Sequence, residues 1–199
     1  YYAATLGARF ASATPSDRVR STAVTAFELA SYGPRMDRSS AVIGTSHSGI
    51  TKTTVDALRA VREHGGRTVG ITHFADRPIS TVSDATLIAG DSPDLSRCHT
   101  KCYVAGALAA AQLALEWRVT AGREPRTQLE PMRSNLQTLP DLLAETLRTT
   151  EAQSAEMAQA HLSRHAVSIF GGGPNLSTAR EAALKIRETS YLPALGMEI

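Results

Sequence analysis

The sequence predicts an α/β fold built on a parallel sheet. Two short runs rich in β-branched and apolar residues, 39–45 and 67–72, flank a segment with helical apolar spacing, 51–66. Short connections join the three pieces, so strand, helix and strand follow one another as in a βαβ unit. Both strands are almost continuously apolar, which is typical of a parallel sheet covered by helices on both faces.

Composition is that of an ordinary globular protein and argues against several functions. The 199 residues are 42% hydrophobic and 20% charged, enough for one or two domains whose core needs no metal or disulfide. A net charge of +2 and 5% aromatic residues give no basis for nucleic-acid binding. No run reaches the roughly 18 apolar residues of a membrane span, so we expect no membrane partner and a cytoplasmic location.

Apolar spacing also predicts the elements that precede the first strand. An apolar residue at every fourth position from Tyr2 to Phe10 indicates a first helix. A short extended piece is expected around Val19. A helix around 26–30 follows, and a Gly-Pro pair ends it.

The elements after the βαβ unit are less regular. Residues 73–84 are expected to form a polar loop and 85–90 a third strand. The helix expected over 100–119 is apolar nearly all round, so it should be buried in the core or at a subunit interface. The polar segment 120–135 contains two prolines and is the expected domain boundary, and a helix over 139–161 comes next.

A strand, a glycine turn and a helix appear again near the end of the sequence. AVSIFGGG predicts the strand and turn, and the helix is expected over 177–191. The sequence therefore predicts two units of one βα design, the second incomplete. We assign 1–125 to a first domain, 126–164 to a linker and connecting helix, and 165–199 to the start of a second domain.

Hydroxyl side chains crowd the turn after the strand at 39–45. Ser46, Ser48 and Thr51 surround Gly49, and the next helix is expected to start near residue 50. The free N–H groups and positive dipole end of a helix N-terminus attract anions, and open α/β sheets bind ligands at the carboxyl ends of their strands. We predict a phosphate monoester site here. In the alternative interpretation Ser48 only caps the helix and the other hydroxyls are solvated.

The charged residues of the helix expected over 177–191 can be interpreted as ordinary surface ion pairs and a helix cap. Lys185 and Glu188 share a helix face, which by spacing alone indicates a surface ion pair, and the same reading fits Glu181 and Arg187. A capping box formed by Thr178 and Glu181 is expected at the start of that helix.

The chain has two cysteines, Cys98 and Cys102, which are expected to be small, buried and reduced side chains. Together with His99 they give three potential metal ligands. No second ligand cluster with zinc-like spacing accompanies them, so we expect no metal site.

Three stretches in combination resemble one known family. VIGTSHSGITKTTVDALRAVREHGGRTVGIT is similar to the signature of sugar isomerase (SIS) domains. FGGGPNLSTAREAALKIRETSYLPA is similar to the second SIS domain in the isomerase half of glucosamine-6-phosphate synthase, and DSPDLSRCHTKCYVAGALA to a further segment of that family. The resemblance implies a doubly wound parallel-sheet SIS sandwich in two tandem copies, the second incomplete in this chain, and a homodimer.

The resemblance also implies roles for single residues. Glu188 would move a proton between C1 and C2 of the sugar, and Lys185 would be its conserved partner, with no metal and no organic cofactor. The sugar phosphate would be bound by the hydroxyl-rich turn, at Ser46, His47, Ser48, Gly49 and Thr51.

The function implied is that of a phosphosugar isomerase-type enzyme, acting on an (amino)hexose phosphate by aldose–ketose isomerisation or deamination. The alternative is a non-catalytic sugar-phosphate-binding regulatory module. The sequence departs from the synthases at His47, where they usually carry Gln, at Ile50, where they carry Glu, and at Gly172, where they carry Arg. A glutamine-hydrolysing domain is not found in these residues, so we expect no glutamine-dependent transfer by this chain alone.

Overall fold

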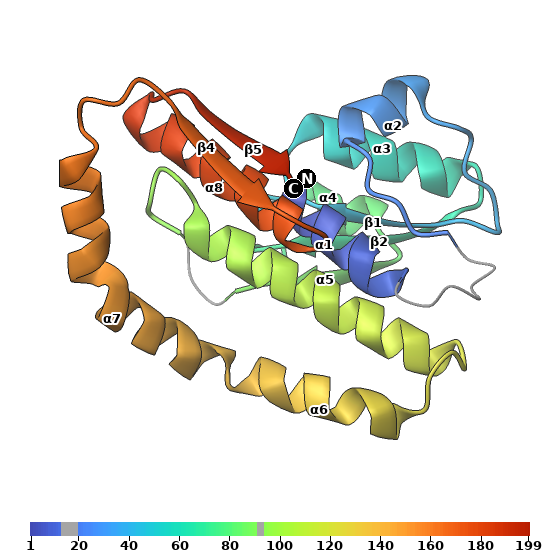
Figure 1. The fold of residues 1–199 in the computed structure, drawn as a ribbon. Helices are drawn as coiled ribbons and strands as arrows, with labels where there is room; N and C mark the ends of the chain where they lie inside the picture. The colour runs from blue at the N-terminus through green and yellow to red at the C-terminus, as the bar shows by residue number, and fades with distance from the viewer. Residues whose placement is uncertain (13–19, 91–93) are drawn as a thin grey trace.

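The computed structural model describes residues 1–12, 20–90 and 94–199, and shows eight α-helices and five β-strands within these ranges. The helices are α1 (Tyr2–Ala11), α2 (Ala26–Tyr32), α3 (Lys52–Glu63), α4 (Pro78–Val82), α5 (Thr100–Thr120), α6 (Arg126–Gln137), α7 (Leu139–Ala160) and α8 (Asn175–Ser190). The strands are β1 (Ala41–Thr45), β2 (Arg67–Thr72), β3 (Ala85–Ile88), β4 (Val167–Gly171) and β5 (Ala194–Glu198). Parallel strands and covering helices confirm the predicted α/β class (Figure 1).

The first sheet has the order β1-β2-β3, and both of its strand pairs are parallel. Helices α3 and α4 pack on one face, and α1 and α5, which pack against each other, lie across the other (Figure 1). The core under α3 and α4 consists of Val55, Leu58, Ile79 and Val82, with Val42 of β1 packed against it. The apolar positions of the predicted 51–66 helix therefore form the core.

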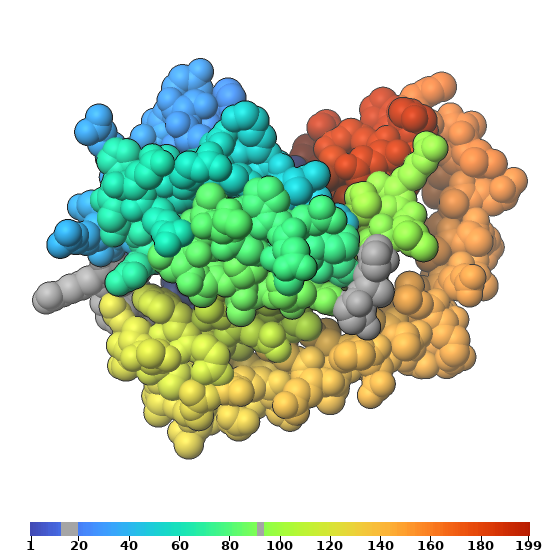
Figure 2. Space-filling view, turned by 180° about the vertical axis from the view of Figure 1, so that it is seen from behind, coloured from blue at the N-terminus to red at the C-terminus, as the bar shows by residue number. Residues whose placement is uncertain are grey.

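The second sheet joins β4 and β5 in parallel, and α8 connects and covers them. Helices α6 and α7 run along the edge of the molecule as one long band (Figure 2). The apolar side chains of α7 are exposed, and Leu147 reaches 71%. Of the helices the structure describes, none combines the length and apolarity that crossing a membrane would require.

Several local expectations were wrong. The predicted loop at 73–84 contains α4, since Pro78 begins a turn of helix that buries Ile79 and Val82. The predicted linker at 120–135 contains most of α6. Strand β5 is an additional element for which no expectation was stated. The extended piece expected around Val19 lies outside the described residues. The domain boundaries stay a prediction.

Candidate functional site

The hydroxyl-rich turn, defined as Ser46–Thr51, lies between β1 and α3 and is held by the neighbouring β2 and α4. The Ser46 N–H donates to the carbonyl of Ile71 at 2.9 Å, and the carbonyl of His47 accepts the N–H of His73 at 3.1 Å. The Ile79 N–H of α4 donates to the Gly49 carbonyl at 3.0 Å. The turn is thus fixed by backbone hydrogen bonds at the carboxyl edge of the sheet.

Gly49 is required by this arrangement. Its φ of +67° is a left-handed conformation that side chains rarely adopt. A Cβ there would lie 2.6 Å from Cβ of Arg77 and 2.8 Å from Oγ1 of Thr72. The turn therefore packs directly against the chain that leads from β2 into α4.

The hydroxyls of the turn fall into two groups. Ser46 is 7% exposed, and its Oγ lies 2.9 Å from the Thr51 hydroxyl and accepts the Gly49 N–H at 3.1 Å. Ser46 therefore stabilises the turn itself. Thr51 is exposed and Ser48 half-buried, so these two hydroxyls are the ones that a ligand can reach.

Helix α3 begins at Lys52, close to the predicted start near residue 50. Thr51 is its N-cap, and its side chain does not bond the amides of the first turn. The Ser48 hydroxyl instead accepts the N–H of Ile50 at 3.4 Å. The interpretation of Ser48 as a simple helix cap is therefore wrong, and the first-turn amides and dipole end of α3 stay available to an anion.

Three imidazoles and a thiol gather beside this turn. The ring centroid of His47 is 5.1 Å from that of His73 and 5.0 Å from that of His99. The Sγ atom of Cys102 lies 3.6 Å from Nε2 of His47. We call His47, His99 and Cys102 the imidazole–thiol cluster; their ligating atoms all lie within 4.8 Å of one another.

The start of α5 holds its half of the cluster in place. His99 precedes the helix with the left-handed angles φ 48° and ψ 42°. Asp94 accepts the N–H of Cys102 at 3.2 Å and the Ser96 hydroxyl at 2.6 Å. The hydrogen bond from Ser96 holds the pKa of Asp94 well below its usual range, so this carboxylate is ionised and caps the helix.

Burial changes the protonation of the cluster. It lowers the pKa of His47, and the neighbouring His99 and His73 lower it further. Burial, assisted by Asp94, raises the pKa of the Cys102 thiol to about 11. At neutral pH the cluster therefore offers a neutral imidazole at His47 and a protonated thiol at Cys102.

The second candidate region is an ion triad on α8, formed by Glu181, Lys185 and Glu188. Nζ of Lys185 lies 2.9 Å from Oε2 of Glu188 and 3.1 Å from Oε1 of Glu181. Burial opposes the charge on the ammonium, but the two carboxylates outweigh it and raise the pKa of Lys185. The side chain of Glu188 is 40% exposed, against 19% for Lys185 and 11% for Glu181.

Sequence reasoning missed the part played by Glu181. The expected capping box is wrong because α8 begins at Asn175, with Pro174 as its N-cap. The expected pairing of Glu181 with Arg187 is wrong too, because Arg187 donates to the carbonyl of Ala194. The spacing of four residues between Glu181 and Lys185 is the sequence feature that could have indicated their ion pair.

The first turn of α5 links the two regions. Cys102 faces His47, and the hydroxyl of the next residue, Tyr103, lies close enough to α8 to feel the charge of Glu181. Burial raises the pKa of this tyrosine, and the charge of Glu181 adds to the effect. The charge of the ion triad thus acts on the first turn of α5, one residue from Cys102.

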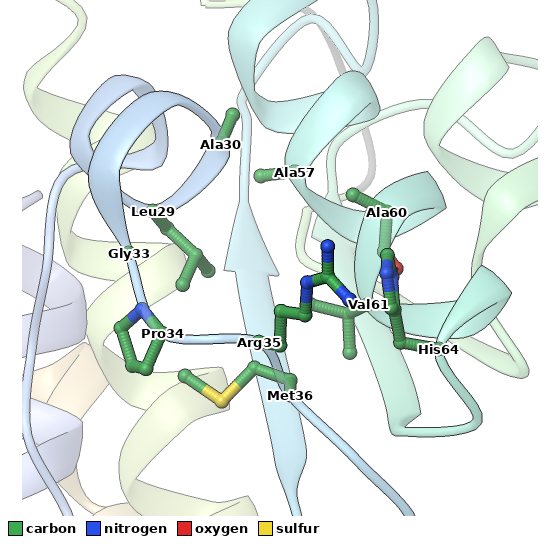
Figure 3. Close-up of a pocket in the computed structure, with 10 residues that line it drawn as sticks. All are labelled: Leu29, Ala30, Gly33, Pro34, Arg35, Met36, Ala57, Ala60, Val61 and His64. Carbon is green, nitrogen blue, oxygen red and sulfur yellow. The ribbon is translucent and has the colours of Figure 1, made fainter.

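A surface pocket elsewhere on the molecule is a poor candidate. It has a volume of about 110 Å³ and lies between α2 and the C-terminal half of α3 (Figure 3). Its walls are mostly apolar, and Nδ1 of His64 is bonded to the Ala60 carbonyl at 2.7 Å. It is at the opposite end of α3 from the hydroxyl-rich turn.

The fold and this turn match a known class of domain. Residues 21–115 match the family model of the SIS domain. The chain therefore contains an SIS domain, as its motifs predict, and the matched residues include the hydroxyl-rich turn and most of α5.

Comparison with individual proteins shows which members of this class the chain is similar to. The chain is 31% identical over 180 residues to glutamine–fructose-6-phosphate aminotransferase (isomerizing) of Pyrobaculum aerophilum, covering 90% of this chain and 29% of the relative. It shares the fold of the C-terminal domain of glucosamine-fructose-6-phosphate aminotransferase from Francisella tularensis, with a TM-score of 0.92, 18% identity, and coverage of 100% of this chain and 55% of that one. The glucosamine-6-phosphate deaminase of Thermotoga maritima matches with a TM-score of 0.74 and 19% identity, over 100% of this chain and 56% of that one. The chain is thus homologous to an aminotransferase isomerase domain and spans less than a third of the curated relative.

Proposed function

We propose that the chain binds a sugar phosphate at the hydroxyl-rich turn. The observation that carries the proposal is the N-terminus of α3, which has no side-chain cap and lies at the carboxyl edge of a parallel sheet, with the accessible hydroxyls of Ser48 and Thr51 in the turn that precedes it. A phosphate monoester offers three oxygens to these donors. His47 and Gly49 belong to the same site, the first as a wall and the second by admitting a ligand close to the backbone.

We further propose the chemistry of a phosphosugar isomerase-type enzyme, in which an (amino)hexose phosphate undergoes aldose–ketose isomerisation or deamination. Glu188 would carry the proton between adjacent sugar carbons, and Lys185 would stabilise the charge that develops. The names of the Pyrobaculum and Thermotoga relatives support this class of substrate.

A regulatory, non-catalytic sugar-phosphate-binding module is the second candidate. Two features of the ion triad favour it. The Glu188 side chain is 40% exposed, so it lacks the burial that suits a carboxylate for proton transfer, and Lys185 is already held by two carboxylates.

An affinity measurement on variants tests whether the sugar phosphate binds at the hydroxyl-rich turn. Thr51→Val should weaken the affinity for glucosamine 6-phosphate or fructose 6-phosphate about tenfold or more, since a hydrogen bond to a charged group contributes about 1.5–3 kcal/mol. Thr149→Val on the exposed surface of α7 is the matched control and should leave affinity unchanged. Isothermal titration calorimetry gives both numbers, and equal affinities for the two variants would contradict the proposed site.

Catalysis is tested separately at Glu188. Glu188→Gln should abolish interconversion of hexose phosphates, or ammonia release from glucosamine 6-phosphate, while sugar-phosphate affinity is retained. Glu156→Gln on α7 serves as the control. Unchanged turnover in the Glu188 variant would remove this residue from the mechanism, and sugar-phosphate binding with no turnover in the wild type would favour the regulatory module.

Assembly and location belong to the same proposal. We expect a homodimer, supported by the exposed apolar side chains of α7, among them Leu142 at 58% and Leu147 at 71%. Light scattering of the purified chain measures the state directly. A cytoplasmic location is expected from the metabolic function named for the relatives, and cell fractionation tests it.

A further inference from the structure

We propose that the imidazole–thiol cluster of His47, His99 and Cys102 is a binding site for a divalent transition metal ion of the zinc and cobalt class. Imidazole nitrogen and thiolate sulfur are the ligands that such ions prefer. The inference rests on the geometry of three side chains and does not depend on the proposed sugar-phosphate site.

The distance between His47 and Cys102 fits a tetrahedral ion. With metal–nitrogen bonds near 2.0–2.1 Å and a metal–sulfur bond near 2.3 Å, tetrahedral angles put nitrogen and sulfur about 3.6 Å apart. Nε2 of His47 and Sγ of Cys102 are separated by 3.6 Å. All three ligating atoms lie within 4.8 Å of one another, against about 3.3–3.6 Å around a tetrahedral ion, so a side-chain shift of at most about 1.5 Å completes the set with His99.

The backbone holds these ligands before any ion arrives. His99 and Cys102 are three apart at the start of α5, where Asp94 fixes the helix by accepting the Cys102 N–H. His47 is fixed through its carbonyl, which accepts the N–H of His73 at 3.1 Å. The left-handed backbone at His99, with φ 48°, is the kind of local strain that gathers at functional sites.

The third imidazole beside the cluster, that of His73, is engaged elsewhere. Nδ1 of His73 is bonded to the Ala89 carbonyl at 2.8 Å, so this ring lines the cluster from the side. Among the described residues, Nδ1 of His47 has no hydrogen-bond partner. On binding, the metal–sulfur bond replaces the Cys102 thiol proton, which leaves to solvent, and a water or another small ligand completes the fourth position.

Cobalt substitution tests the site on the full 199-residue chain after treatment with a chelator. One Co²⁺ per chain should bind and give both the visible bands of a tetrahedral ion and the near-ultraviolet thiolate-to-cobalt band. Cys102→Ser should lose the thiolate band, while the matched control Cys98→Ser should keep it. His99→Ala should weaken Co²⁺ binding about tenfold or more, and His165→Ala, on an exposed histidine, should not.

Circular dichroism shows whether each variant is folded. For a variant that does not fold, Cys102 is tested in the wild type by its alkylation rate, which Zn²⁺ should suppress for Cys102 and not for Cys98. Absence of the tetrahedral spectrum, or a spectrum that Cys98→Ser removes and Cys102→Ser does not, overturns the proposal. Sugar-phosphate affinity is measured on the chelated protein, so failure of either proposal is seen without the other.

Discussion

Replacing Gly49 with Ala tests the geometry of the hydroxyl-rich turn, because a Cβ at this position has no room. The left-handed conformation at φ +67° costs an L-residue roughly 1–2 kcal/mol. The new Cβ would also lie 2.6 Å from Cβ of Arg77 and 2.8 Å from Oγ1 of Thr72, and overpacking of this kind costs about 1–3 kcal/mol. The variant should therefore lose about 2–5 kcal/mol of unfolding free energy.

Gly122 supplies a matched control for the backbone part of this cost. It has the same φ of +67°, and a Cβ there would meet nothing within 4 Å. Gly122→Ala should lose only roughly 1–2 kcal/mol, so urea denaturation should separate the two variants by about 1–3 kcal/mol. Equal losses would refute the packing of the turn against the start of α4.

Three other predictions concern the core, the sheet and the ion triad. Leu58→Ala removes a side chain that is 1% exposed, and thermal unfolding should show a loss of about 2–5 kcal/mol. The Thr68 backbone N–H donates to Asp84 at 2.8 Å and lowers the pKa of Asp84 from 3.8. The ionised carboxylate therefore stabilises the folded state above pH 3.8, and this stabilisation is lost as the pH falls through the pKa of Asp84 in the folded protein. Asp84→Asn should therefore destabilise the protein at pH 7, with a difference in urea midpoint that shrinks below pH 4; a constant difference would contradict this. Glu181→Gln should lower the pKa of Lys185 in an NMR titration, and an unchanged pKa would contradict the ion pair.

The main architecture could be predicted because its signals are local. The segment from β1 to β2 contains a strand, a helix and a strand whose apolar spacing is uninterrupted, and Leu58 and Val61 become buried as that spacing requires. The elements that were missed have weak local signals. Helix α4 is five residues long, and β5 is defined by its pairing with β4. Helix α6 contains Pro131 in its interior, and a proline at such a position normally predicts the end of a helix.

The site could be predicted only in part for a different reason. The turn itself lies in one stretch of sequence, so its hydroxyls and Gly49 were recognised together. The different roles of these hydroxyls could not be predicted. Only the folded backbone shows that Ser46 is hydrogen-bonded to Thr51, whereas Thr51 stays exposed. The cluster of His47 with Cys102 joins positions 55 apart in the chain, a separation at which no spacing rule applies.

The gathering of histidines follows from the topology of the sheet. His47 follows β1 and His73 follows β2, and parallel strands end at the same edge, so successive βα units bring residues at equivalent positions together. Hydrogen bonds connect the chain segments along this edge. The His73 N–H donates to the His47 carbonyl, and Nδ1 of His73 is hydrogen-bonded to the Ala89 carbonyl after β3. Helix α5 starts beside this edge and adds His99 and Cys102. A ligand at the hydroxyl-rich turn and an ion at the cluster would therefore share His47, so occupancy of one should change the affinity of the other. By thermodynamic linkage the effect must be equal in both directions.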